Sequence, residues 1–236
     1  MALKLPDKYL KNHLVPQIMQ HLQKEELISY EVDHSPGLDG FMSTLYNIKL
    51  KTKSAESVKE RWLILKVMRG EGDFRQSSKS YIQFANEIYF YTSVLAAFKE
   101  VMEVAEECSV KVEDLLPKCY VAEFGYIEGL SFSVKDVESV LVLEHLEPLN
   151  YRMGPRVYLN FEHLLGMSRL LGKYHACSYA LRSTNITKWN QLIAGIKPLA
   201  FVDINRPDDK NNFYRILYRV AFDRFFDYLK RRKDNI

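Results

Sequence analysis

The sequence predicts an α+β fold, with a five-stranded antiparallel sheet in its first part and helices in its last part. Short runs of about five to ten apolar or alternating residues, bounded by turn residues, occur up to residue 143. After residue 160, apolar residues recur three and four positions apart, as on one face of a helix. A chain of 236 residues with 47% apolar and 27% charged residues is long and apolar enough to bury a core.

The expected elements can be placed in order along the chain. Strands are expected at 28–32, at 41–50, around Lys66, at 119–126 and at 139–143, with a polar hairpin connection at 51–60. Helices are expected at 7–26, at 73–107 in two pieces, at 161–181 and at 212–232. Pro16 interrupts the first helix, because proline lacks the N–H that an inner helical turn needs. Pro117 ends the long helical region before the fourth strand.

Lys66 and Glu87 are the most informative residues. Lys66 follows the apolar run of the third expected strand, and Glu87 lies on the helix that comes next. A lysine held by a helical glutamate is how protein-kinase-like folds bind the phosphates of ATP. Each residue alone has a simpler interpretation, as a surface lysine of a strand and as a solvated glutamate. Their order along the chain favours a nucleotide site.

Two further segments fit the same order. Gly40 and Ser43 lie in a glycine-containing turn before the lysine strand, where backbone N–H groups can approach phosphates. An ordinary turn is the alternative. The last expected strand leads into Glu144 and Leu146, which suits a hinge whose backbone receives adenine; the alternative is a core strand that ends in a polar turn. A hinge there divides the chain into an ATP-binding lobe, 1–146, and a helical lobe, 147–236.

Composition excludes several classes of function. A net charge of +3 is small for this length and does not indicate a nucleic-acid binder. The three cysteines are too few and too scattered for a disulfide framework or a metal site, so a cytoplasmic protein without a bound structural metal is expected. No apolar stretch approaches the roughly 20 residues of a transmembrane helix.

Six segments together resemble the ecdysteroid kinase-like proteins of insects, a choline-kinase-like branch of the protein-kinase-like fold. The segments are 40–46, 62–66, 84–91, 116–120, 141–146 and 171–180. The resemblance implies an ATP- and Mg²⁺-dependent kinase that phosphorylates a hydroxyl group of a steroid or similar small compound. It implies that the turn at Gly40 and Ser43 covers the phosphates and that Lys66 contacts the α- and β-phosphates. Glu87 would orient Lys66, and the segment from Glu144 to Leu146 would receive the adenine.

The sequence departs from the family pattern in two places. His145 stands where these proteins usually carry an aspartate. The family's H-G-D-x-W-x-x-N catalytic loop and its later metal-binding aspartate are not found before Ile236. The expectation is therefore a complete small lobe and an incomplete large lobe, with no catalytic residue and no Mg²⁺ ligand in this chain. A fragment, a truncated isoform and a shortened gene product would all have this sequence.

Two other functions stay open at this point. The chain could be a non-catalytic kinase-like module that engages a protein partner through helices of its incomplete lobe. The last helix could also lie on an acidic lipid surface through basic residues such as Arg215 and Arg219, although Asp223 and Asp227 dilute its charge. Phosphoryl transfer to a small hydroxyl compound distinguishes the kinase from both.

Overall fold

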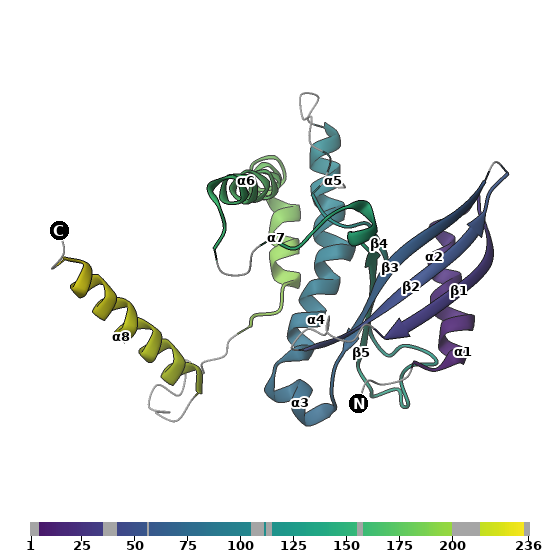
Figure 1. Cartoon of the computed structure of the whole chain (residues 1–236), viewed down its shortest axis with the longest axis horizontal. Coiled ribbons are helices and arrows are strands. Elements are labelled where there is room, and N and C mark those ends of the chain that lie inside the picture. The colour runs from purple at the N-terminus through teal and green to yellow at the C-terminus, as the bar shows by residue number, and fades with distance from the viewer. Residues whose placement is uncertain are drawn as a thin grey trace. The chain divides into compact units, whose positions relative to one another are not determined.

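The computed structural model describes residues 5–34, 42–55, 57–104, 111, 115–154, 158–199 and 213–233. The chain divides into two compact units, Met1–Lys197 and Pro198–Ile236. Each unit is described by itself. The first unit contains the sheet and all helices up to α7, and the second contains helix α8 (Figure 1).

The first unit is built on a five-stranded sheet in which every neighbouring pair is antiparallel, as the sequence predicts. The strands run β1 (Glu26–His34), β2 (Ser43–Lys53), β3 (Val58–Met68), β5 (Glu138–Glu144) and β4 (Cys119–Gly125) across the sheet. The expected polar connection at 51–60 is wrong in extent, because β2 and β3 stay paired as far as Lys53 and Val58. Its lysines alternate with buried residues such as Thr52, so they belong to the exposed side of a strand.

One face of the sheet carries the main apolar core. Alternate residues of the central strands point to this face and are buried, among them Ile48, Leu50, Leu65 and Val142. The N-terminal helical segment packs against it, with α1 (Asp7–Tyr9), a π turn η1 (Leu10–Leu14) and α2 (Val15–Gln20) (Figure 1). The expected first helix therefore ends at Gln20. Its interruption is a widened turn just before Pro16, which accommodates the missing proline N–H.

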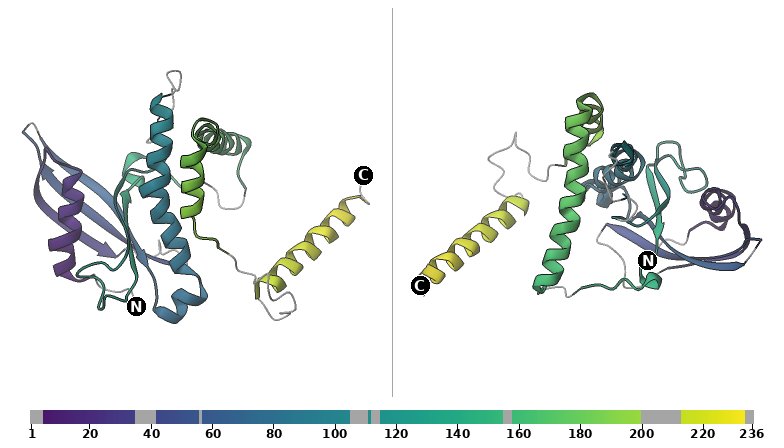
Figure 2. Two further views of the ribbon diagram at one scale, coloured as in Figure 1. Left: turned by 180° about the vertical axis from the view of Figure 1, so that it is seen from behind. Right: turned by 90° about the horizontal axis from the view of Figure 1, so that it is seen from above.

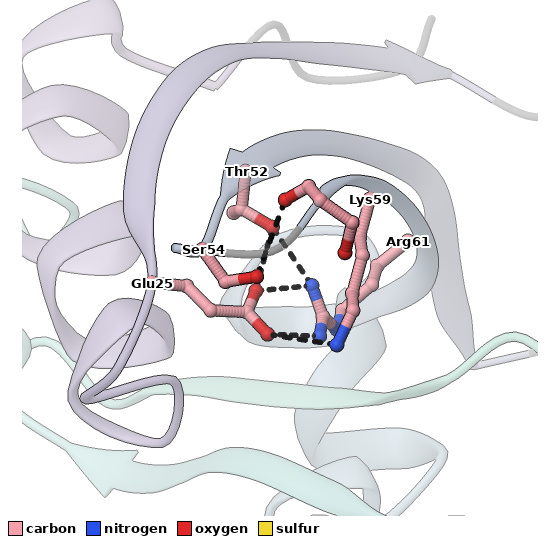
Figure 3. Close-up of polar contacts among 6 residues, drawn as sticks. Glu25, Thr52, Ser54, Lys59 and Arg61 are labelled. Atoms are coloured by element: carbon pink, nitrogen blue, oxygen red, sulfur yellow. Dashed lines mark hydrogen bonds and ion pairs between the residues drawn. The ribbon is translucent and has the colours of Figure 1, made fainter.

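A polar network ties the end of this segment to the β2–β3 hairpin (Figure 3). The Arg61 guanidinium donates to both carboxylate oxygens of Glu25 at 2.5 Å, and the Thr52 hydroxyl donates to Glu25 at 2.6 Å. Lys59 adds an ion pair of 3.8 Å. These hydrogen bonds, from Arg61 first and from Thr52 second, lower the pKa of Glu25 below its ordinary value of 4.5.

This network predicts an acid-dependent stability. A lowered folded-state pKa gives stability that is fully present above about pH 5 and is lost as the pH falls through the folded pKa of Glu25. Glu25→Gln lacks this titration, so it should be less stable than wild type at pH 7, and the difference should shrink toward pH 3. Urea unfolding at several pH values measures it. A difference that does not change with pH would contradict the role given to Glu25.

Helices pack on the other side of the sheet, where α4 contacts β4 and β5. The column formed by α3 (Gly72–Ser77), α4 (Ser80–Tyr89), a π turn η2 (Phe90–Val94) and α5 (Leu95–Val104) is the helical region expected at 73–107 (Figure 1). Helices α6 (Phe161–Thr184) and α7 (Ile186–Gly195) follow beside α5, and the view from behind in Figure 2 shows the same neighbours. A second apolar cluster joins them around Phe98, Cys177 and Leu181.

Helix α7 has no counterpart among the elements expected from the sequence. The sequence nevertheless contains a helix-start residue, Asn185. Its side chain accepts a hydrogen bond from the Lys188 N–H at 3.0 Å and caps the helix. Trp189 and Leu192 follow at helical spacing and pack on the second apolar cluster. Helix α7 therefore begins directly after Asn185.

The second unit contains α8 (Phe213–Lys233), which agrees with the helix expected at 212–232. Large apolar side chains of α8 are exposed around much of its circumference, including Leu217, Phe222 and Phe226. No helix among the described residues is both long and apolar enough to cross a membrane. The division between lobes at residue 146 stays a prediction, since the first compact unit runs on to Lys197.

Candidate functional site

Lys66 and Glu87 form a close ion pair on the sheet face that lies opposite the main core. Lys66 Nζ lies 2.7 Å from both Oε1 and Oε2 of Glu87. The two side chains are 28% and 31% exposed, so the pair is open to a ligand on one side. The ammonium also lies 5.2 Å from the ring centroid of Phe84. The pairing of these two residues, expected from their order in the sequence, is present in the structure.

The alternation of β3 explains why Lys66 points to this face. Leu65 and Val67 are buried in the main core, so Ile64 and Lys66 point the opposite way. In the register of the sheet, Lys66 lies between Leu45 of β2 and Leu141 of β5. A shift of β3 by one residue against its neighbours would move every one of these side chains to the opposite face of the sheet.

Helix α4 positions Glu87. Its buried residues Phe84, Ala85 and Ile88 hold it in place, while Glu87 remains free to reach the lysine. The chain turns from β3 toward this helix at Gly70, which has a φ of +74° and where a Cβ would lie 2.6 Å from the Phe74 ring. Glycine is therefore required at this turn.

Arg75 fixes the same connection from the side of α3. Its guanidinium donates to Glu138 Oε1 at 2.9 Å, to the Val137 carbonyl at 3.1 Å and to the Met68 carbonyl at 3.4 Å. These bonds join the end of β3 to the start of β5, with side chains that are only 12% and 17% exposed for Arg75 and Glu138. The connection between Lys66 and Glu87 is thus attached to both β3 and β5.

Apolar residues surround the pair on the same face. Ile64 is half-buried and lies opposite Leu143 of β5 in the sheet register. Leu45 lies directly opposite Lys66. Sequence reasoning did not single out Ile64 or Leu45, although a period of two counted back from Lys66 places Ile64 on its face. Together they form an apolar floor beside a charged pair.

Tyr91 is a further neighbour that sequence reasoning missed. It lies in η2, one turn beyond Glu87. Burial, and then the charges of Glu87 and Cys119, raise the pKa of Tyr91 to about 12. The phenol therefore stays neutral and adds no negative charge beside the carboxylate that Lys66 needs.

The predicted hinge is a compact turn after β5. The Glu144 N–H donates to the Lys118 carbonyl at 2.8 Å, and the His145 N–H donates to the Trp62 carbonyl at 3.0 Å. The Leu146 carbonyl accepts hydrogen bonds from Leu149 and Tyr151. His145 Nδ1 accepts from the Glu147 N–H at 3.2 Å, so the histidine supports the turn with its side chain at the position where the family usually has aspartate.

A cavity of about 250 Å³ adjoins this turn. Glu144 lines it, together with residues of β3, of β4 and of the turn after β5: Glu60, Arg61, Trp62, Leu63, Tyr120, His145, Pro148 and Leu149. Leu146 is not among these residues. Of the remaining predicted residues, Ser43 is buried at the start of β2, opposite Met68, and Gly40 lies outside the described residues.

The arrangement places a positive charge beside apolar residues, without a metal centre in the described part of the chain. The Lys66 ammonium can bind an anion beside apolar residues that suit a ring system. Within the same part, no group of three or more His, Cys, Asp or Glu residues could hold a metal ion.

Comparison with known proteins identifies the family. The family model described as the ecdysteroid kinase-like family matches residues 37–236. Searches of curated proteins and of solved structures gave no match. The matched region contains strands β2 to β5, the Lys66–Glu87 ion pair and the turn after β5. The match covers most of the sequence, and the chain belongs to the ecdysteroid kinase-like family.

Proposed function

We propose that this chain binds ATP as part of a kinase that phosphorylates a hydroxyl group of a steroid or similar small molecule. The observation that carries the proposal is the Lys66–Glu87 ion pair, open on one side and surrounded by apolar residues. Membership of a kinase-like family supports the same class of reaction.

Lys66 would hold the phosphates. A lysine ammonium has three N–H donors. Two of them bond to the Oε1 and Oε2 atoms of Glu87, which leaves the third for a phosphate oxygen of ATP. Glu87 would keep the ammonium aimed at the open side, so that the phosphates meet a charge in a fixed position and Lys66 loses little side-chain entropy on binding.

Adenine would lie between the apolar floor and the turn after β5. Ile64, Leu45 and Leu143 offer apolar contact to its ring. The Leu146 carbonyl already accepts two hydrogen bonds, so Leu146 would contribute its N–H to the adenine edge. The Glu144 N–H already donates to the Lys118 carbonyl, so Glu144 would contribute its carbonyl oxygen to the adenine. The segment from Gly40 to Ser43, which leads into β2, would cover the phosphates; this stays a prediction for both residues.

Mg²⁺, when bound with ATP, neutralises phosphate charge during transfer. The described residues offer it no ligand set of three or more carboxylate, histidine or cysteine side chains. No H-G-D tripeptide occurs within the 236 residues. A second candidate is a kinase-like module that binds nucleotide or a protein partner without phosphoryl transfer.

A transfer assay distinguishes the two candidates. The 236-residue chain is incubated with Mg²⁺ and γ-phosphate-labelled ATP, with hydroxylated steroids as acceptors, and nucleotide binding is titrated in parallel. Labelled steroid product supports the kinase. Binding without product supports the module. A chain that shows neither binding nor transfer at millimolar ATP would contradict the kinase and a module that binds nucleotide, and would leave only a module that binds a protein partner.

A further inference from the structure

Asn86, the residue before Glu87, holds the segment that follows α7. Its Nδ2 donates to the Lys197 carbonyl at 2.8 Å, and its Oδ1 accepts from the Lys197 N–H at 2.8 Å. Both polar groups of one side-chain amide are thus used on the backbone of one residue, 111 positions away in the sequence. Only this orientation of the amide satisfies both bonds.

Other contacts also hold the end of α7 close to its neighbours. The Tyr89 hydroxyl of α4 donates to the Leu192 carbonyl of α7 at 3.2 Å, and Lys197 Nζ lies 5.2 Å from the ring centroid of Phe124 in β4. A Cβ added to Gly195 would lie 2.3 Å from atoms of the Tyr89 ring. The end of α7 therefore approaches α4 at a distance that only glycine permits.

Helix α4 faces three neighbours at once. Phe84 and Ile88 are buried, Glu87 reaches Lys66, and Asn86 and Tyr89 bond to the segment at the end of α7. A small rotation or shift of this ten-residue helix would carry Glu87 with it, because Asn86 and Glu87 are adjacent in one rigid element. The Glu87 carboxylate reaches Lys66 through a flexible side chain that is 31% exposed, so it has little packing of its own to resist such a shift.

We propose that Asn86 is a positioning residue for the Lys66–Glu87 ion pair. The two hydrogen bonds between Asn86 and the Lys197 backbone keep α4 in the position in which Glu87 pairs with Lys66. When these bonds are lost, the ion pair loosens. Lys197 is the last residue of the first compact unit, so these two hydrogen bonds lie where the first unit ends along the chain. The consequence for ATP rests on the proposed function, whereas the effect on the ion pair does not.

Chemical labelling of lysine tests the effect on the ion pair without nucleotide. Acylation requires an amine that is free to react, and an ammonium held by two carboxylate oxygens reacts slowly. Asn86→Asp is nearly isosteric but places an oxygen against the Lys197 carbonyl, so Lys66 should be acylated at least about threefold faster than in wild type. Rates come from mass spectrometry of peptides.

Lys49 is the matched control. It lies on the same sheet face, is 30% exposed and forms an ion pair of 3.4 Å with Glu60. Its rate should not change in Asn86→Asp. In a Glu87→Gln background, adding Asn86→Asp should not increase the Lys66 acylation rate further, because Asn86 affects Lys66 only through Glu87. If Asn86 had a purely structural role, Asn86→Asp would raise the acylation rates of Lys66 and Lys49 together. It would also raise the Lys66 rate further in the Glu87→Gln background.

Nucleotide titrations then separate this proposal from the proposed function. Asn86→Asp should weaken ATP binding at least about threefold while leaving adenosine, which has no phosphates, unchanged. If wild type binds no ATP, the proposed function fails and the labelling result still decides the role of Asn86. Should Asn86→Asp unfold the chain, Asn86→Ser and Gly195→Ala disturb the same contacts. Lys66 acylation at the wild-type rate in the folded variants overturns the proposal.

Discussion

Replacing Lys66 by alanine is expected to abolish the stabilisation of this chain by ATP. A ligand at about 100 times its Kd adds roughly 2.7 kcal/mol to the free energy of unfolding. For a chain of this size that corresponds to a rise in Tm of roughly 5–10 °C. Without the Lys66 ammonium, the carboxylate of Glu87 faces the phosphates and repels them, so the rise should disappear.

Lys49→Ala is the control for this prediction. Lys49 lies on the same sheet face with similar exposure, pairs with Glu60 and lies 5.2 Å from the Trp62 ring centroid. The variant loses the same charge from the same side of the sheet. It should retain most of the rise in Tm with Mg²⁺-ATP in differential scanning fluorimetry. Equal losses in Lys49→Ala and Lys66→Ala would mean that only net charge matters.

Leu65→Ala is expected to cause the largest loss of stability among single changes in β3. Leu65 is 0% exposed, lies within the main core and is paired with Tyr46 of β2. Removing a fully buried leucine side chain costs about 2–5 kcal/mol, through lost burial and the cavity that remains. The measurement is urea unfolding followed by circular dichroism, at neutral pH without nucleotide.

Ile64→Ala provides the matched comparison one residue earlier. Ile64 is only half-buried and points to the face of Lys66. It should cost less stability than Leu65→Ala but should weaken ATP binding more, since it removes apolar contact from the proposed adenine site. The opposite order, with Ile64→Ala the more destabilising variant, would mean that the faces of β3 are assigned wrongly.

The sequence was sufficient to predict the sheet and the ion pair, because both depend on local patterns. Alternation around Lys66 and the helical spacing around Glu87 placed one residue on a strand and the other on the next helix. Their meeting requires only that consecutive elements pack together, which is the common case. The extents of β2 and β3 were underestimated because a lysine-rich exposed strand face looks like a loop.

The long-range polar contacts could not be predicted from the sequence. Asn86 and Lys197 are 111 positions apart, and Glu25 and Arg61 are 36 positions apart. An asparagine on a helix or a glutamate in a turn has many possible partners, and no periodicity identifies the one it meets. Helix α7 was missed for a different reason. It is a helix of ten residues, and a capping asparagine before it does not by itself distinguish a helix from a turn.

The most direct measurement of the central claim uses an ATP acyl phosphate, which transfers its acyl group to a lysine beside the bound phosphates. The wild-type chain is labelled at neutral pH with and without excess ATP, and the acylated lysines are identified by mass spectrometry. Binding of ATP phosphates at the Lys66–Glu87 ion pair predicts a label on Lys66 that excess ATP suppresses, with Lys49 unaffected. A Lys66 label that ATP does not suppress, or an ATP-suppressed label only on other lysines, would contradict a nucleotide site at this pair.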